Sequence, residues 1–334
     1  MANILKNNLA QRVLVTGGAG FIGSATVNVL KTKGYDVVIA DNLSKHASKT
    51  RNDVKFINTD LTKKENAEKA MSGIDYVIHL AAKIGGIGYF HKYPATIISE
   101  NNQLNSAIFN AAVKNKIKRI VYISSSMVFE NTNRYPSCEE DVKNIPPPTS
   151  AYGFSKLSGE KYCEAYHDEY GLNYTIIRPF NAYGINERPG TEIGYAHVIP
   201  DLIKKMLQGQ YPLELLGDGK QTRCFTHVSD IAEGIIAAME KKEGENNDFN
   251  ISNEEEIQII DLAKKLWELL KIEKPFKVKF TKSFKYDVRK RVPSVKKARD
   301  ILGWQAKVKL EQGLKEVISW LKEEYEKKTL VEDV

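Results

Sequence analysis

Thr16-Gly17-Gly18-Ala19-Gly20-Phe21-Ile22-Gly23 is the stretch of sequence that predicts the fold. It follows a short apolar run, Arg12 to Thr16, and opens a helical pattern that extends from Phe21 to Lys33. A strand, a glycine turn and a helix in this order let the backbone approach a pyrophosphate, which rests on the helix N-terminus. The predicted dinucleotide contacts are Gly17, Gly20, Phe21, Ile22 and Gly23.

The next apolar run, Val37 to Ala40, ends in an acidic residue, Asp41, which Asn42 follows. An acid about twenty residues beyond the glycine turn is where a carboxylate accepts hydrogen bonds from both hydroxyls of a ribose. The same carboxylate would repel a 2′-phosphate. Asp41 and Asn42 therefore predict NAD, rather than NADP, as the cofactor.

Further apolar runs predict the rest of the sheet. They cover Val54 to Ile57, Tyr76 to Leu80, Ile120 to Ile123 and Tyr174 to Ile177, and helical segments separate them. Short strands that alternate with helices predict a doubly wound parallel sheet, a Rossmann-type α/β fold. The residues after two of these runs, which are further predicted cofactor contacts, are Asp60, Leu61, Leu80, Ala81 and Ala82.

The pattern changes after Arg178, where loops rich in glycine and proline begin. We expect an NAD-binding domain over residues 1–180 and a smaller mixed α/β substrate lobe over 181–334. Within the second half, the segment 223–253 could return to the main sheet through Phe249-Asn250-Ile251. The elements expected in the lobe are helices at 197–209, 229–241, 259–270 and 310–322 and a strand at 213–216.

The composition of the chain limits which binding partners and which cellular compartment we expect. The net charge is +7 and the pI is 9.0, but Lys and Arg are scattered over helical patterns, which favours a solvated surface over a nucleic-acid site. Three cysteines form no CxxC pair and leave an odd thiol, as in a reducing compartment. No stretch approaches the roughly 20 apolar residues that span a bilayer. We expect a cytoplasmic protein that binds neither nucleic acid nor membrane.

Tyr152-Gly153-Phe154-Ser155-Lys156 carries the predicted chemistry, together with the run Ser124 to Ser126. Residues four apart share a helix face, so the Lys156 ammonium can favour the phenolate of Tyr152. Removing a hydride from a secondary alcohol needs such a base and an oxidised nicotinamide beside the carbon. No metal is required, and we expect none.

Taken in this order, the motifs resemble the extended short-chain dehydrogenase/reductase family, and within it the enzymes that modify nucleotide sugars. The resemblance covers nearly the whole chain. It implies that Tyr152 is the acid/base, that Lys156 lowers its pKa and holds the nicotinamide ribose, and that Ser125 hydrogen-bonds the reacting sugar hydroxyl. It also implies that Asn101 is a cofactor-binding residue and that the protein is a homodimer, formed through the helices near 97–114 and 151–170.

The residues after Ser125 separate the reactions within this family. Sugar dehydratases resemble this chain but have Asp-Glu where it has Ser126 and Met127, and decarboxylases have Glu at the second position. The segment 82–87, with His197-Val198, is similar to GDP-fucose synthase and GDP-mannose 3,5-epimerase, which use Cys there. A thioether cannot transfer a proton, so Met127 counts against all of these.

The interpretation that remains is a C4 epimerase similar to UDP-glucose 4-epimerase, which oxidises the C4 hydroxyl, rotates the 4-keto sugar and returns the hydride to its other face. A GDP-sugar 3,5-epimerase/4-reductase, or another NAD-dependent nucleotide-sugar dehydrogenase or dehydratase, stays open. His197 is either an acid/base or a residue that binds phosphate or sugar.

The expected substrate is a nucleoside-diphosphate sugar, whose diphosphate requires cations. The segments 217–223 and 287–291 resemble the two that supply arginines in the family. Arg223 and Arg289 are the predicted contacts, with Arg291 as an alternative to Arg289. The full set of predicted substrate residues is Lys83, Ser126, Asn181, His197, Val198, Arg223 and Arg289.

Overall fold

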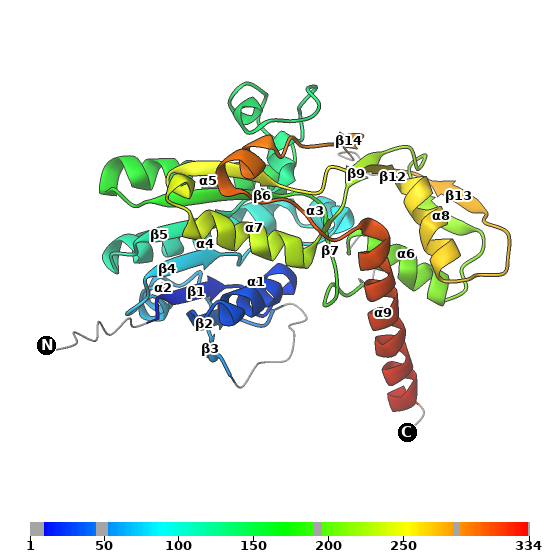
Figure 1. The fold of residues 1–334 in the computed structure, drawn as a ribbon, viewed down its shortest axis with the longest axis horizontal. Coiled ribbons are helices and arrows are strands. Elements are labelled where there is room, and N and C mark those ends of the chain that lie inside the picture. Colours follow the sequence, from blue (N-terminus) through cyan, green and yellow to red (C-terminus); the bar gives the residue numbers. More distant parts are fainter. Residues whose placement is uncertain (1–9, 45–52, 190–195, 284–287, 333–334) are drawn as a thin grey trace, which may run out of the picture.

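The computed structural model describes residues 10–44, 53–189, 196–283 and 288–332 (Figure 1). A large sheet covered by helices occupies one side of Figure 1, and a smaller group of helices and short strands occupies the other. Within the described ranges, no helix has the length and apolar character needed to cross a bilayer.

The large sheet has seven strands, all parallel, in the order β11-β6-β5-β4-β1-β2-β3. This arrangement confirms the predicted doubly wound α/β fold. The apolar segment at 249–251 does return to this sheet as part of its seventh strand. The strands are β1 (Arg12–Thr16), β2 (Asp36–Asp41), β3 (Lys55–Asn58), β4 (Tyr76–His79), β5 (Arg119–Ile123), β6 (Tyr174–Pro179) and β11 (Asn247–Ile251).

Helices cover both faces of this sheet, which is why its central strands are apolar without interruption. On one face, α1 (Phe21–Thr32) and α7 (Val228–Glu240) pack against each other and contribute Leu30 and Ile235 to a core with the strands. On the other face lie α2 (Lys64–Ala70), α4 (Pro94–Lys114) and α5 (Ala151–Tyr170). Of these helices, α5 carries the two predicted catalytic residues Tyr152 and Lys156.

The smaller lobe has its own core, in which Leu202, Leu262 and Leu314 are fully or almost fully buried. Its helices are α6 (Val198–Leu207), α8 (Ile259–Leu269) and α9 (Leu310–Glu332), and they confirm three predicted helices within a few residues, although α9 continues beyond the predicted end. Its strands are β7 (Ala182–Tyr183), β8 (Leu213–Leu216), β9 (Thr222–Cys224), β10 (Thr226–His227), β12 (Glu256–Gln258), β13 (Val278–Thr281) and β14 (Lys290–Arg291).

Short helical segments complete the chain. A helix, α3 (Ile87–Lys92), follows the fourth strand of the large sheet, and η1 (Ser126–Phe129) follows the fifth. The others are η2 (Glu139–Lys143), η3 (Lys242–Gly244) and η4 (Ala298–Leu302). Both α3 and η1 follow the carboxyl ends of central strands, α3 after the loop 80–86 and η1 after two residues, so they can deliver side chains to that edge of the sheet.

The strand order reverses between β1 and β4, because the chain continues from β1 to β2 on one side and reaches β4 on the other. In open α/β sheets, ligands bind in the crevice that such a reversal leaves outside the carboxyl ends of the strands. The topology therefore places the site between the large sheet and the smaller lobe.

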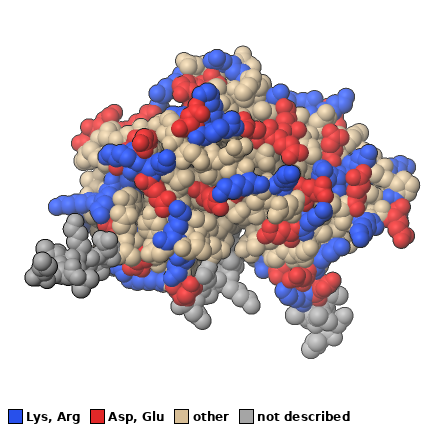
Figure 2. Space-filling view, in the orientation of Figure 1, with Lys and Arg blue, Asp and Glu red and all other residues tan. Residues whose placement is uncertain are grey.

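Charge on the visible face is mixed. Figure 2 shows Lys and Arg interspersed with Asp and Glu, without an extended field of one sign. On this face, the mixed charge is the pattern of a solvated surface.

Replacing Gly159 should loosen the attachment of α5. A Cβ there would lie 1.9 Å from the Tyr122 hydroxyl oxygen, and Tyr122 is buried in β5. We expect Gly159→Ala to lower the free energy of unfolding by about 1–3 kcal/mol, although alanine is the better helix former. Urea unfolding measures this. Lys161→Ala, on the exposed side of the same helix, should stay within about 0.5 kcal/mol; a more stable Gly159→Ala variant would contradict the expectation.

Candidate active site

A cavity of about 1210 Å³ lies at the predicted crevice, with walls from both the large sheet and the smaller lobe. All predicted site residues line it except Asn101 and Arg289. Its volume exceeds the range common for a single small ligand, so it has room for a dinucleotide and a second molecule.

The glycine turn leaves space for a pyrophosphate. Gly17 has a φ of +68°, and a Cβ on it would lie 2.8 Å from the backbone of Ala81. A Cβ on Gly23 would lie 2.1 Å from the carbonyl oxygen of Gly17. Gly20 caps α1 without a side chain, so the first N–H groups of the helix can meet a phosphate.

Asp41 stands where an adenosine ribose would lie, at the carboxyl end of β2. Its carboxylate accepts hydrogen bonds from the backbone N–H groups of Ala19, at 3.1 Å, and Leu43, at 2.9 Å. These bonds fix the carboxylate between the glycine turn and the following loop. The arrangement fits NAD, because an anion held there disfavours a 2′-phosphate.

Tyr152 and Lys156 lie one turn apart on the face of α5 that meets the sheet, and both are buried. Lys156 Nζ donates a hydrogen bond to the carbonyl oxygen of Ile123, at 2.8 Å, and lies 6.0 Å from the centre of the Tyr152 ring. Burial lowers the pKa of Lys156 to about 8, against the opposing effect of Glu160. The pKa of this amine therefore lies closer to neutral pH than that of an exposed lysine.

The source of phenolate stabilisation differs from the prediction. Burial raises the pKa of Tyr152 to about 12, and the groups that oppose this rise are a hydrogen bond with Ser125 and the positive charge of Arg291. Lys156 does not by itself make the phenol acidic in the protein alone. The positive charge of an oxidised nicotinamide would act in the same direction as Ser125 and Arg291.

Two apolar side chains frame the phenol. The Phe90 ring stacks on that of Tyr152, with centres 4.6 Å apart and planes 8° from parallel. Met127 is 5% exposed and packs with Tyr152 and Ile97. Phe90 is not among the residues predicted from the sequence, because α3 is too short to show a periodic pattern.

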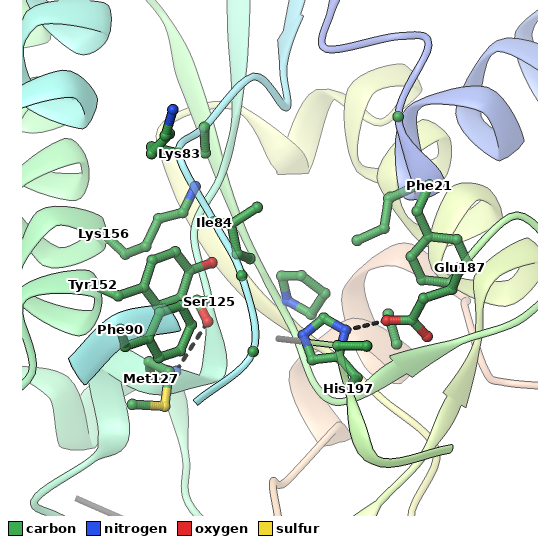
Figure 3. Close-up of a pocket in the computed structure, with 18 of the residues that line it drawn as sticks. Phe21, Lys83, Ile84, Phe90, Ser125, Met127, Tyr152, Lys156, Glu187 and His197 are labelled. Carbon is green, nitrogen blue, oxygen red and sulfur yellow. Dashed lines mark hydrogen bonds and ion pairs between the residues drawn. The ribbon is translucent and has the colours of Figure 1, made fainter. Parts of the chain in front are cut away.

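On the other side of the cavity, His197 caps the N-terminus of α6. Figure 3 shows its imidazole between Glu187 and the wall that carries Ser125 and Tyr152. Nδ1 of His197 is hydrogen-bonded to Glu187. Nothing in the sequence singled out Glu187, because its hydrogen bond with His197 is a contact of the folded protein.

Two arginines lie opposite each other in the three-stranded sheet β12-β9-β14. Arg291 in β14 lies opposite Arg223 in β9, and both line the cavity. Arg289 does not: its guanidinium is exposed and forms an ion pair with Asp218 at 2.8 Å. The structure therefore places Arg291, the alternative from the sequence, in the cavity wall instead of Arg289. Asp287, at the start of the same segment, lies outside the described residues.

Asn101 lies behind the wall of the cavity rather than in it. Its side chain accepts a hydrogen bond from the backbone N–H of Lys83, at 2.7 Å, and donates one to Ser155, at 3.0 Å. This ties the loop after β4 to α5. In the protein alone, Asn101 therefore positions Lys83, which does line the cavity.

Fold and site together define an enzyme of the extended short-chain dehydrogenase/reductase type, since a dinucleotide crevice meets a buried Tyr-x-x-x-Lys pair at one edge of the sheet. The model of the "NAD dependent epimerase/dehydratase family" matches residues 13–252. The chain belongs to that family, whose cofactor is NAD.

Individual relatives cover almost the whole chain. The UDP-N-acetyl-alpha-D-glucosaminuronate decarboxylase of Bacillus cytotoxicus is 35% identical over 94% of this chain and 99% of its own length. A putative UDP-glucose 4-epimerase of Methanocaldococcus jannaschii is 35% identical over 93% and 98%. The structure of the UDP-glucose 4-epimerase of Thermotoga maritima with UDP-glucose is 33% identical, with a TM-score of 0.85, and covers 94% of this chain and 100% of its own. The two curated relatives carry names of different reaction types at the same identity, so overall similarity does not assign the reaction.

Asp41→Asn should weaken NAD binding about tenfold or more, because a charged acceptor of ribose hydrogen bonds becomes neutral. The preference for NAD over NADP should fall as well, since the repulsion of a 2′-phosphate is removed. Calorimetric titration with both dinucleotides measures this. Asp36→Asn, at the opposite end of β2, is the matched control and should change affinity by less than about twofold. Unchanged discrimination in Asp41→Asn would contradict the assignment.

Ser125→Ala should move the acidic limb of the pH profile of kcat/KM to higher pH. Ser125 lowers the pKa of Tyr152, so its removal raises that pKa and less phenolate is present at a given pH. A shift of about one pH unit corresponds to one lost hydrogen bond. Ser99→Ala, at an exposed position of α4, is the control. An unmoved acidic limb would show that another group controls ionisation.

Proposed function

We propose that this protein is an NAD-dependent epimerase that inverts C4 of a UDP-sugar through a transient 4-keto intermediate. The observation that carries the proposal is the pairing of Ser125, Tyr152 and Lys156 with an apolar neighbour, Met127, in one cavity wall. With NAD as hydride acceptor and donor, these residues can support oxidation and reduction of an alcohol, but Met127 offers no acid for eliminating a hydroxyl.

Each residue has a defined part in this reaction. When bound, NAD supplies the acceptor and donor for the C4 hydride. Tyr152, as phenolate, takes the proton of the C4 hydroxyl and later returns it, and Ser125 donates a hydrogen bond to the same oxygen. Lys156 is fixed by the Ile123 carbonyl and can hold the nicotinamide ribose.

Inversion requires the ketone to present its other face before the hydride returns. The walls formed by Met127 and Phe90 are apolar, so they place few fixed hydrogen bonds on the sugar ring. The diphosphate would stay anchored by Arg223 and Arg291, whose guanidinium groups suit phosphate oxygens. An anchored diphosphate with a loosely held sugar favours rotation.

UDP is the proposed nucleotide because the relatives reported above are named for UDP-sugars. The protein, supplied with NAD, should be incubated with UDP-glucose, UDP-N-acetylglucosamine and UDP-glucuronate, and followed by NMR. The proposal expects the C4 epimer of at least one. Release of carbon dioxide with a UDP-pentose would assign decarboxylation instead, and no change in any sugar would defeat the proposal.

Tyr152→Phe should keep the fold and NAD binding while kcat falls by about two to four orders of magnitude, because only the proton-transfer group is removed. Turnover of the epimerised sugar and calorimetric NAD binding measure the two effects separately. Tyr162→Phe removes a hydroxyl from the same helix without touching the cavity and should retain activity within about threefold. Turnover near wild type in Tyr152→Phe would move the acid/base role to another residue.

A further inference from the structure

Glu187 and His197 form a second pair of ionisable side chains in the cavity, which C4 epimerisation does not use. We propose that they act as a one-sided proton shuttle, which exchanges a hydrogen on a carbon next to C4 with solvent. In this pair His197 is the catalytic residue, and Glu187 is a positioning residue that acts through it.

Glu187 has the surroundings of an orienting carboxylate. Its residue exposure is 7%, and one oxygen is hydrogen-bonded to His197 Nδ1. Its other oxygen, Oε2, is buried and has no hydrogen-bond partner among the described residues. A buried carboxylate stabilises the tautomer that carries its proton on Nδ1, because that N–H can be donated to it. Nε2 then keeps its lone pair.

His197 is placed to use that lone pair. It is the N-cap of α6, and the next turns of α6 bury Leu202 and Ile203 in the lobe core, so the backbone beneath the imidazole is anchored. The side chain is 50% exposed and lines the cavity. Half exposure lets the ring meet both a bound sugar and water, with which it can exchange its proton.

The chemistry depends on the proposed function, because only a 4-keto sugar has acidic hydrogens at C3 and C5. Nε2 takes one of these protons, the C–H electron pair forms the enolate, and imidazolium results. Imidazolium exchanges that proton with water and returns a solvent proton to the same carbon, which restores the ketone and neutral His197. No oxidant or further reactant is consumed.

The exchange should occur without inversion. Epimerisation at C3 or C5 needs a second proton carrier on the opposite face of the sugar. The wall opposite His197 in Figure 3 presents Met127, whose thioether neither gives nor takes a proton. The proton therefore returns to the face from which it left, and the configuration is kept.

The test follows both reactions in one sample. The protein with NAD and each UDP-sugar is incubated in D₂O, and NMR with mass spectrometry measures C4 epimer, deuterium at C3 or C5, and configuration there. We expect deuterium at one of these carbons with retained configuration. In His197→Gln and Glu187→Leu, the ratio of deuterium incorporated to C4 epimer formed should fall about tenfold or more. Glu243→Leu, on the exposed η3, should leave that ratio unchanged.

Each of the other outcomes would overturn a specific part of the proposal. C4 epimer without deuterium would remove the shuttle and leave the proposed function standing. Neither C4 epimer nor deuterium on any sugar would defeat the proposed function, and the shuttle with it. An unchanged ratio in His197→Gln would take His197 out of the exchange, and inversion at C3 or C5 would overturn one-sidedness.

A second measurement needs no turnover. Nitrogen-15 NMR of the histidine rings reports which ring nitrogen carries the proton. We expect neutral His197 to be protonated on Nδ1 in the wild type and in Glu243→Leu, and to shift towards the Nε2 tautomer in Glu187→Leu. The same tautomer in all three proteins would overturn the role of Glu187. If Glu187→Leu does not fold, the ratio in His197→Gln still decides the shuttle.

Discussion

The ion pair between Arg178 and Glu160 is the interaction on which the site depends. Both side chains are buried, and the Arg178 guanidinium donates two hydrogen bonds to the Glu160 carboxylate, each at 2.8 Å. Glu160 also accepts one from Ser124, at 2.5 Å, and Arg178 reaches Asp248 in β11. Breaking such a pair on one side strands a charge and costs about 3–5 kcal/mol. This network fastens α5 to β6, to β11 and to the residue that follows β5, and it thereby holds the helix that carries Tyr152 and Lys156 against the sheet.

The parts of the site that the sequence predicted are those set by local geometry. The glycine turn is required where Gly17 adopts a positive φ against Ala81, and a four-residue spacing puts Tyr152 and Lys156 on one helix face whatever surrounds them. Asp41 ends an apolar strand beside that turn. The doubly wound parallel sheet follows equally from the alternation of short apolar runs with helices, so the fold class was predictable, whereas the order of the strands was read only from the structure.

The parts that the sequence did not predict depend on contacts between distant segments. Arg289 and Arg291 are alike in the sequence, and only the pairing of β14 with β9 decides that Arg291 lines the cavity. Glu187 is singled out only by its hydrogen bond with His197, which no sequence pattern indicates. Tyr152 has an expected neighbour in Lys156, but burial has the largest effect on its pKa, and burial belongs to the assembled protein.

The position of β11 at the edge of the large sheet has a consequence for biosynthesis. Its neighbour β6 is complete about 70 residues before β11 leaves the ribosome, an interval on the order of several seconds at usual translation rates. Throughout that interval the nascent sheet ends in an unpaired strand whose Ile176 and Ile177 later become buried. Such an edge can recruit another nascent chain. A chaperone that covered this strand during synthesis would therefore guard against aggregation.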